Sequence, residues 1–313
     1  MFITGPYITG TGAATQMKAV SSPEDARRVV AYWAEEGVDW FKAYTRIGHD
    51  ELAAAIHEAH QRGVKVTGHL CSVSFTEAVG LGIDNIEHGF FTNSDYVEGK
   101  EQGVCPPTVR QSLLDVDLDG VEVQTTIREM VDANVAMTST LAVYELSVPN
   151  RPPLEDRVLE MMAPAAREEY LQTRNEISSR DDSPMATLFP KAQAFEKAFV
   201  DAGGLLAAGV DPTGMGGALP GYGDQRNYEL LLEAGFTPEQ VIQIMTLNGA
   251  QVLGEDHRFG SIEAGKLADL VIINGDPVQR ASEIRNVTLV FKEGVGYDSP
   301  KLIESVKGLV GLR

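Results

Sequence analysis

Residues 64–88 have the sequence VKVTGHLCSVSFTEAVGLGIDNIEH. Two short segments in this stretch, 64–70 and 83–88, contain the Val and Ile residues that favour β-strands and have the length of strands. Between them, residues 75–81 predict a short helix that stops at Gly82, since glycine commonly follows the last helical residue. A strand, a helix and a strand in this order predict two parallel strands joined by a crossover helix.

The same alternation continues on both sides of this stretch. Upstream, residues 22–25 (Ser-Pro-Glu-Asp) predict a helix start, with serine as the N-cap, proline at the first helical position and acids in the first turn. That helix is expected to end at Gly37. Further expected elements are strands at 38–44, 135–141 and 205–210 and helices at 50–62, 119–133 and 187–202. Repetition of this pattern predicts an α/β architecture with a parallel sheet.

Two regions depart from the alternation. Residues 144–190 are rich in proline at both ends and contain two polar helical stretches, which we interpret as an insertion on one loop. After Gly249, short segments at 260–266, 268–273 and 287–292 are separated by glycine-containing turns and predict a small β element.

Composition excludes several classes of function. The chain has 313 residues and a formal net charge of −19, from 26 Lys and Arg against 45 Asp and Glu. A pI near 4.7 argues against nucleic-acid binding, which requires a basic surface. No apolar run approaches the roughly 20 residues that span a bilayer. The two cysteines, Cys71 and Cys105, cannot form a disulfide framework, and Cys71 is expected to be a buried, inert thiol. No signal peptide is visible at the start of the sequence, and the compartment is left open.

Polar residues lie within or at the end of four of the predicted strands. Lys42 lies within an aromatic strand, His69 and His88 end the next two strands, and Asp211 follows the apolar segment 205–210. Each has an ordinary explanation by itself: a lysine that reaches solvent, packed histidines, and a turn aspartate. Together they place four polar groups at one end of a parallel barrel, which is where barrel enzymes carry their chemistry. Imidazole and carboxylate groups are also ligands that Zn²⁺ prefers, and a buried neutral amine can react with carbon dioxide to form a metal-bridging carbamate.

These segments resemble the amidohydrolase superfamily, in its branch of imidazolonepropionase-like and Xaa-Pro-dipeptidase-like enzymes. The resemblance implies a (β/α)8 TIM-like barrel that lacks its first two strands, plus a remnant of a small β-sandwich. It places the catalytic barrel, with strands 3–8 and the insertion at 144–190, in residues 1–250. The C-terminal sandwich portion and a terminal helix would occupy residues 251–313. The segments that carry the resemblance are residues 40–44, 65–70, 85–89, 209–214, 234–238, 246–250 and 260–271.

The resemblance also implies roles for individual residues. Lys42 would be the carboxylated lysine of strand 4, and His69 and His88 the metal ligands of strands 5 and 6. Asp211 would be the strand 8 ligand and the general acid/base. The family activates a hydroxide on a divalent metal, expected here to be one or two Zn²⁺ ions, and cleaves a carbon–nitrogen bond of an amide, peptide or cyclic amide.

One part of the family pattern is absent. Members carry His-x-His on strand 1, whereas the six histidines here are at positions 49, 57, 60, 69, 88 and 257. We therefore expect an N-terminally truncated chain in which only the site formed by Lys42, His69 and His88 keeps all its ligands. Two alternatives follow: a catalytically impaired remnant that acts only through association, and a mononuclear esterase or lactonase.

Substrate contacts are expected from residues beyond the strand ends. Tyr44 and Arg46 follow the strand of Lys42, Thr140 ends the strand at 135–141, and Tyr222 lies beyond Asp211. Arg46 or Arg226 could bind a substrate carboxylate, although each also fits an ordinary surface arginine. The expected partner is a small amide or dipeptide, with no nucleic acid and no membrane, and the chain is expected to form a homo-oligomer.

Overall fold

The computed structural model describes residues 1–12, 16–152, 154–180 and 182–311. The chain divides into two compact units, each described here by itself. Unit 1 contains residues 1–139 and 194–206, and unit 2 contains residues 140–193 and 207–313.

Unit 1 is organised around a parallel sheet with the strand order β2-β1-β3-β4-β5-β6-β7. Strands β1 to β6 pair in parallel, so the carboxyl ends of neighbouring strands lie along one edge of the sheet. β7 begins at the last residue of unit 1. The strands are β1 (Ile8–Thr9), β2 (Lys18–Ala19), β3 (Trp40–Ala43), β4 (Lys65–Gly68), β5 (Asn85–Glu87), β6 (Ala136–Ser139) and β7 (Leu206–Ala208).

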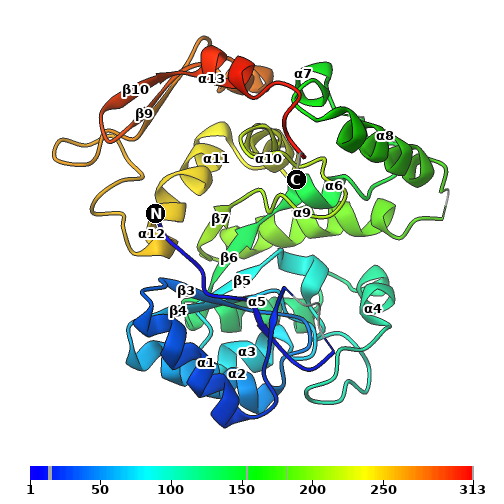
Figure 1. The fold of residues 1–313 in the computed structure, drawn as a ribbon. Helices are drawn as coiled ribbons and strands as arrows, with labels where there is room; N and C mark the ends of the chain where they lie inside the picture. Colours follow the sequence, from blue (N-terminus) through cyan, green and yellow to red (C-terminus); the bar gives the residue numbers. More distant parts are fainter. Residues whose placement is uncertain (13–15, 153, 181, 312–313) are drawn as a thin grey trace. The chain divides into compact units, whose positions relative to one another are not determined.

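The helices of unit 1 begin where the sequence predicts. The Ser22 side chain accepts a hydrogen bond of 3.1 Å from the Asp25 backbone N–H and caps α1. Ser74 and Glu77 form a capping box at the start of α3. Figure 1 shows α1, α2 and α3 packed side by side along the sheet. The helices are α1 (Pro23–Glu35), α2 (His49–Gln61), α3 (Phe75–Leu81), η1 (Gly89–Thr92), α4 (Val109–Asp115), α5 (Val121–Asp132) and the second half of α9 (Met185–Asp201).

The N-terminal segment runs beside β3. Thr4 forms an isolated bridge to Trp40, and regular pairing begins where Ile8 faces Ala43. The sequence did not predict β2, which pairs with β1 through only two residues, too few for a periodic pattern.

Unit 2 is mainly helical and ends in a three-stranded antiparallel sheet of order β10-β9-β8. The insertion packs on residues that follow β7, in a cluster that includes Leu146, Val158, Tyr170, Val210 and Leu219. The elements are α6 (Leu141–Glu145), α7 (Asp156–Leu159), α8 (Pro164–Ser178), the first half of α9, α10 (Tyr222–Glu233), α11 (Pro238–Met245), α12 (Leu247–Leu253), β8 (Leu270–Ile273), η2 (Ala281–Arg285), β9 (Val287–Lys292), β10 (Val295–Asp298) and α13 (Ser299–Ser305).

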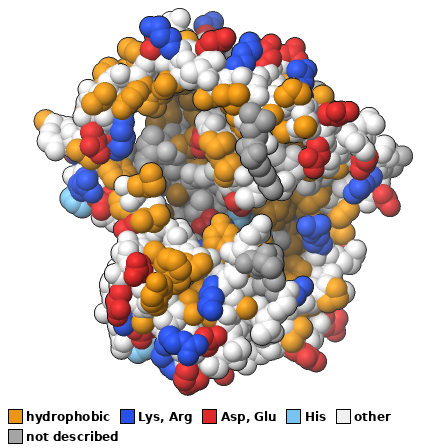
Figure 2. Space-filling view, viewed as in Figure 1, with side chains coloured by type: hydrophobic (Ala, Val, Ile, Leu, Met, Phe, Trp, Pro, Cys, Tyr) orange, Lys and Arg blue, Asp and Glu red, His pale blue; other side chains and the backbone are white. Residues whose placement is uncertain are grey.

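The small antiparallel sheet differs from its prediction at one end. Residues 260–266 are not a strand but a pair of turns, because Gly260 and Gly265 have positive φ values of 95° and 98°. β10 supplies the third strand instead. Hydrophobic side chains remain at the surface over β9, β10 and α13, including Val295, Tyr297 and Leu302 (Figure 2).

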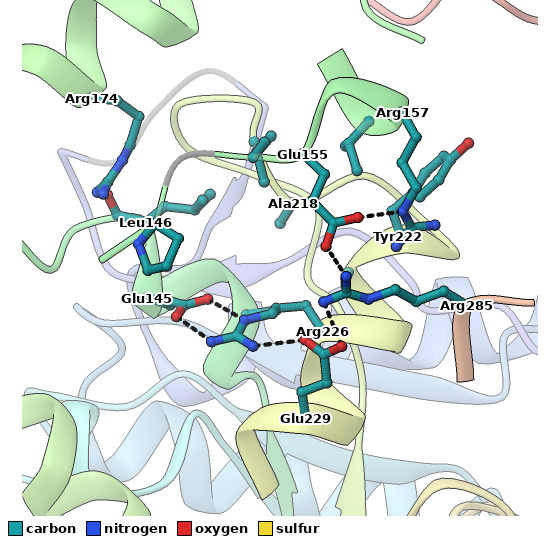
Figure 3. Close-up of a pocket in the computed structure, with 16 residues that line it drawn as sticks. Glu145, Leu146, Glu155, Arg157, Arg174, Ala218, Tyr222, Arg226, Glu229 and Arg285 are labelled. Carbon is teal, nitrogen blue, oxygen red and sulfur yellow. Dashed lines mark hydrogen bonds and ion pairs between the residues drawn. The ribbon is translucent and has the colours of Figure 1, made fainter. Parts of the chain in front are cut away.

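An ion-pair network ties the insertion of unit 2 to α10 and η2 (Figure 3). Arg226 donates two hydrogen bonds to Glu145, at 2.8 and 2.7 Å, and one each to Glu229 and Glu233. Arg151 also binds Glu145, at 2.6 Å. Burial raises the pKa of Glu145, but the hydrogen bonds and charges of the two arginines outweigh it, so the pKa lies below its usual range.

Replacing Arg226 with methionine is expected to lower the free energy of unfolding by about 2 kcal/mol. This loss lies between the free energies that exposed and buried ion pairs typically contribute, because the Arg226 side chain is 28% exposed and that of Glu145 10%. Because the pKa of Glu145 is depressed in the folded state, its stabilising effect is present above the ordinary pKa of 4.5 and is lost as the pH falls below it. Urea unfolding should therefore show a larger difference in unfolding free energy between the wild type and Arg226→Met at pH 7 than at pH 4.

Lys301→Met serves as the control for that measurement. Lys301 pairs with Asp298 at 2.9 Å, but its side chain is 85% exposed, so its loss should have little effect. An Arg226→Met protein as stable as the wild type at pH 7 would contradict the prediction.

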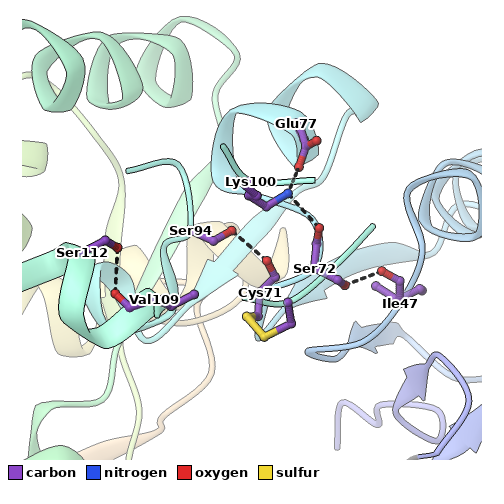
Figure 4. Close-up of a disulfide and its surroundings, with 9 residues drawn as sticks. Ile47, Cys71, Ser72, Glu77, Ser94, Lys100, Val109 and Ser112 are labelled. Atoms are coloured by element: carbon purple, nitrogen blue, oxygen red, sulfur yellow. Dashed lines mark hydrogen bonds and ion pairs between the residues drawn. A yellow bond between two sulfur atoms is a disulfide. The ribbon is translucent and has the colours of Figure 1, made fainter. Parts of the chain in front are cut away.

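A disulfide in unit 1 corrects the expectation of a free, inert Cys71. Cys71 is bonded to Cys105, with a Cα–Cα distance of 5.0 Å (Figure 4). The loop that carries Cys105 is held against the end of β4 by other contacts as well: Ser94 donates to the Cys71 carbonyl at 2.7 Å, and Lys100 donates to the Ser72 carbonyl at 2.9 Å. The pairing spans 34 residues, so no local pattern could reveal it.

No helix in the described part of the chain has both the length and the apolar character needed to cross a membrane.

Candidate functional site

Three of the residues singled out in the sequence come together at the carboxyl edge of the unit 1 sheet. Lys42 is on β3, and His69 and His88 follow β4 and β5 directly. The sheet positions both histidines through their backbones: His69 N–H donates to the Ala43 carbonyl and His88 N–H to the Thr138 carbonyl, each at 3.0 Å. The two imidazole rings lie 4.5 Å apart, centroid to centroid.

Aromatic rings form a continuous row at this edge. Tyr7 stacks on Tyr44 at 5.8 Å, Tyr44 lies 4.7 Å from His69, and His69 contacts His88. The amine of Lys42 lies over the Tyr7 ring, 5.2 Å from its centroid. The sequence prediction missed Tyr7, because it precedes a strand of only two residues, whereas Tyr44 was expected near the site.

Both histidines are neutral at pH 7. Burial, together with the charge of Lys42, lowers the pKa of His69 to about 4. Burial and the neighbouring His69 and Lys42 hold the pKa of His88 well below its usual range. Neutral imidazole is the form that binds a metal ion, so the folded chain presents two nitrogen ligands without first having to lose a proton.

His88 is held in an unusual backbone conformation. Its φ is 69° and that of Gly89 is 52°, so two successive left-handed residues turn the chain at the end of β5. A side chain at Gly89 would meet the Met137 sulfur at 3.2 Å, which explains glycine at this position. The turn therefore places the His88 imidazole, which is only 1% exposed, inside unit 1.

A buried acid, Glu196, lies beside this turn. It is 1% exposed and comes from α9, and its carboxyl oxygen would be 3.5 Å from a side chain placed at Gly89. Burial raises its pKa to about 8, and the nearby Ser139 hydroxyl offsets part of that effect. Glu196 is thus protonated at neutral pH. The sequence held no signal for it, because a glutamate on a helix usually faces solvent.

The remaining predicted site residues lie elsewhere. Arg46 is exposed in unit 1 and donates to the Gly12 carbonyl at 2.8 Å. Asp211 follows β7 in unit 2 with a left-handed φ of 46°. Thr140, in the same unit, is buried just before α6, and Tyr222 begins α10 with the Arg157 guanidinium 5.0 Å from its ring. The catalytic and substrate-binding roles of these residues stay predictions.

The donor set of unit 1 fits a metal ion on one condition, which is the carboxylation of Lys42. Among the described residues, no group of three or more His, Cys, Asp or Glu side chains is arranged to hold a metal. His69 and His88 supply two neutral nitrogens, and an ammonium at Lys42 would repel a cation. Carboxylation would convert that amine into an anionic oxygen donor and complete a set of the nitrogen and oxygen ligands that zinc prefers.

The chain is similar to several known proteins. The profile described as "Amidohydrolase family" matches residues 2–296. A 77-residue segment is 42% identical to an adenine deaminase of Clostridium botulinum (strain Loch Maree / Type A3), covering 22% of this chain and 13% of that protein.

Two solved structures extend the comparison to the fold. Bottromycin amidohydrolase has 18% sequence identity and a TM-score of 0.68, covering 97% of this chain and 66% of its own. A Xaa-Pro dipeptidase with bound methionine in its active site has 20% identity and a TM-score of 0.61, covering 92% and 64%. This chain thus spans slightly less than two thirds of the length of these two proteins. The likeness indicates a TIM-barrel-like fold. Since the family profile covers most of the sequence, the chain belongs to the amidohydrolase family.

Proposed function

We propose that the chain is the metal-dependent part of a hydrolase that cleaves a carbon–nitrogen bond in a small amide, dipeptide or cyclic amide. The observation that carries the proposal is the meeting of Lys42 with two neutral histidines, the half-buried His69 and the buried His88, at the carboxyl edge of the sheet. That edge is where catalytic residues of parallel α/β barrels gather.

His69, His88 and a carboxylated Lys42 would hold the divalent metal, with Zn²⁺ the best match for these donors. When bound, such a metal lowers the pKa of a water molecule to about 7 and polarises a substrate carbonyl. Burial keeps the two imidazoles unprotonated, so they remain available as ligands across the physiological pH range.

Asp211 is the proposed general acid/base. A carboxylate can take a proton from the attacking water and deliver it to the leaving nitrogen, which allows the amine to depart as a neutral group. Asp211 has a left-handed backbone and lies three residues beyond the end of β7, outside any regular element. Tyr44, Arg46, Thr140 and Tyr222 are the proposed substrate contacts.

The proposal predicts turnover that depends on a metal. The full chain should hydrolyse at least one member of a panel of dipeptides, N-acyl amino acids and cyclic amides. Chelation should remove that activity and Zn²⁺ with bicarbonate should restore it, because bicarbonate supplies the carbon dioxide for lysine carboxylation. The measurement is product formation across the panel, with metal content determined on the same samples.

Each other outcome of this assay is informative. Turnover confined to esters and lactones would favour the mononuclear esterase or lactonase. A metal-free, self-associating protein without turnover would favour a remnant that acts through association. Amide hydrolysis that survives chelation would contradict the proposed mechanism.

A further inference from the structure

Unit 2 contains a cavity of about 160 Å³ between α6, α7, α8 and α10 (Figure 3). Apolar side chains form much of its lining, among them Ala142, Leu146, Val158 and Ala218. Its volume is close to that of an engineered apolar cavity of about 150 Å³ that binds benzene. The cavity is therefore large enough for a compact organic molecule.

Charged groups also line the cavity, and most of them neutralise one another. Arg226 is bound by Glu145 and Glu229, and Arg285 forms ion pairs with Glu229 and Glu155. Arg157 binds Glu155 as well, at 2.5 Å, and its guanidinium stacks over the Tyr222 ring. Three of the four arginines in the lining are thus held in ion pairs with its glutamates.

Arg174 is the exception among the cavity-lining arginines. It is 5% exposed on α8, and the described residues place no carboxylate within 4.0 Å of its guanidinium. Its Nη1 donates to the carbonyls of Leu146 and Val148, at 2.5 and 3.1 Å, and its Nη2 to the Arg151 carbonyl at 3.0 Å. These bonds use three of the five N–H donors of a guanidinium, which leaves two donors and a full positive charge.

We propose that this cavity is a binding site for a small organic monocarboxylate with a compact apolar body. A buried charge is costly without a counter-ion, and a carboxylate is the partner that an arginine binds most strongly. The apolar lining would receive the remainder of the molecule. Because Glu145, Glu155 and Glu229 also line the cavity, a second negative charge on the ligand would be repelled.

Glu145 is not the counter-ion of Arg174. Figure 3 shows its carboxylate directed toward Arg226, while Arg174 points toward Leu146. Arg151 binds Glu145 too, so the charge of this glutamate is already shared by two guanidinium groups.

Calorimetric titration of the full chain with isovalerate and with isovaleramide tests the proposal. The two molecules share size and shape but differ in charge. We expect saturable binding of isovalerate at one site per chain, at least tenfold tighter than that of the amide. Equal affinity for the two molecules, or no saturable binding of isovalerate, would overturn the proposal.

Two variants locate the binding in this cavity. Arg174→Met should reduce isovalerate affinity at least tenfold, whereas Arg167→Met, at an exposed arginine on the same helix, should leave it unchanged. Ala218→Leu keeps Arg174 but fills the cavity, so it should also abolish isovalerate binding. If Arg174→Met fails to fold, Ala218→Leu alone tests whether isovalerate binds in this cavity. Undiminished binding by folded Ala218→Leu would refute the site.

The cavity shares Tyr222 with the proposed substrate contacts of the hydrolase, but its carboxylate binding can be tested separately from that activity. His88→Asn changes unit 1 only, so it should leave isovalerate affinity unchanged. Loss of binding in that variant, with the fold retained, would show that the carboxylate binds elsewhere.

Discussion

Replacing His88 with asparagine is expected to reduce both metal content and amide turnover by more than about 100-fold. The imidazole is one of two neutral nitrogen ligands in the proposed site, and even partners that only orient a metal ligand cost about 10–100-fold when removed. Asparagine is the informative replacement because it tolerates the left-handed backbone, with a φ of 69°, that His88 adopts.

The control for this substitution is His57→Asn. His57 is exposed on α2, where it contacts Gln61 at 2.9 Å, so it lies outside the predicted ligand set. Metal content measured by atomic absorption and turnover measured on the best amide substrate should both stay at the wild-type level. A His88→Asn enzyme with full metal content and full turnover would exclude His88 as a ligand.

Replacing Glu196 with glutamine is expected to stabilise the protein at pH 8 by up to about 4 kcal/mol. The folded-state pKa of about 8 lies well above the ordinary value of 4.5, and each pKa unit corresponds to about 1.4 kcal/mol. Because the folded chain keeps this proton and the unfolded chain loses it, wild-type stability should be full below pH 4.5. It should fall as the pH rises toward 8.

Glutamine resembles the protonated acid in shape but does not titrate. Urea unfolding between pH 5 and pH 8 should therefore show a smaller loss of stability in Glu196→Gln than in the wild type. Glu168→Gln, at an exposed position on α8, is the matched control. If the wild type and Glu196→Gln lose stability in parallel over this range, Glu196 is not held as a buried neutral acid.

Local signals determined most of the secondary structure. The helix start at Ser22 and the stop at Gly82 were predicted from capping and turn residues, and both occur in the structure. The order of strands and helices also identified the α/β class. Such features depend on residues within one or two turns of each other, so a single sequence contains them.

Sequence and resemblance together singled out Lys42, His69 and His88. These residues lie in or directly after strands whose carboxyl ends meet at one edge of a parallel sheet. The structure adds the short distance between the imidazoles and the burial that keeps them neutral. Neither could be read from the sequence, because depth of burial depends on which helices and loops cover the edge of the sheet.

Tertiary structure alone decided the remaining features. The bond between Cys71 and Cys105, the neutral acid at Glu196 and the buried charge of Arg174 all depend on packing between segments far apart in the chain. The prediction of a strand at 260–266 was wrong, because Gly260 and Gly265 have positive φ values and bend the chain there. The amino-acid sequence thus determined the elements and the chemistry they carry, whereas burial and long-range pairing determined the charge state and partner of each group.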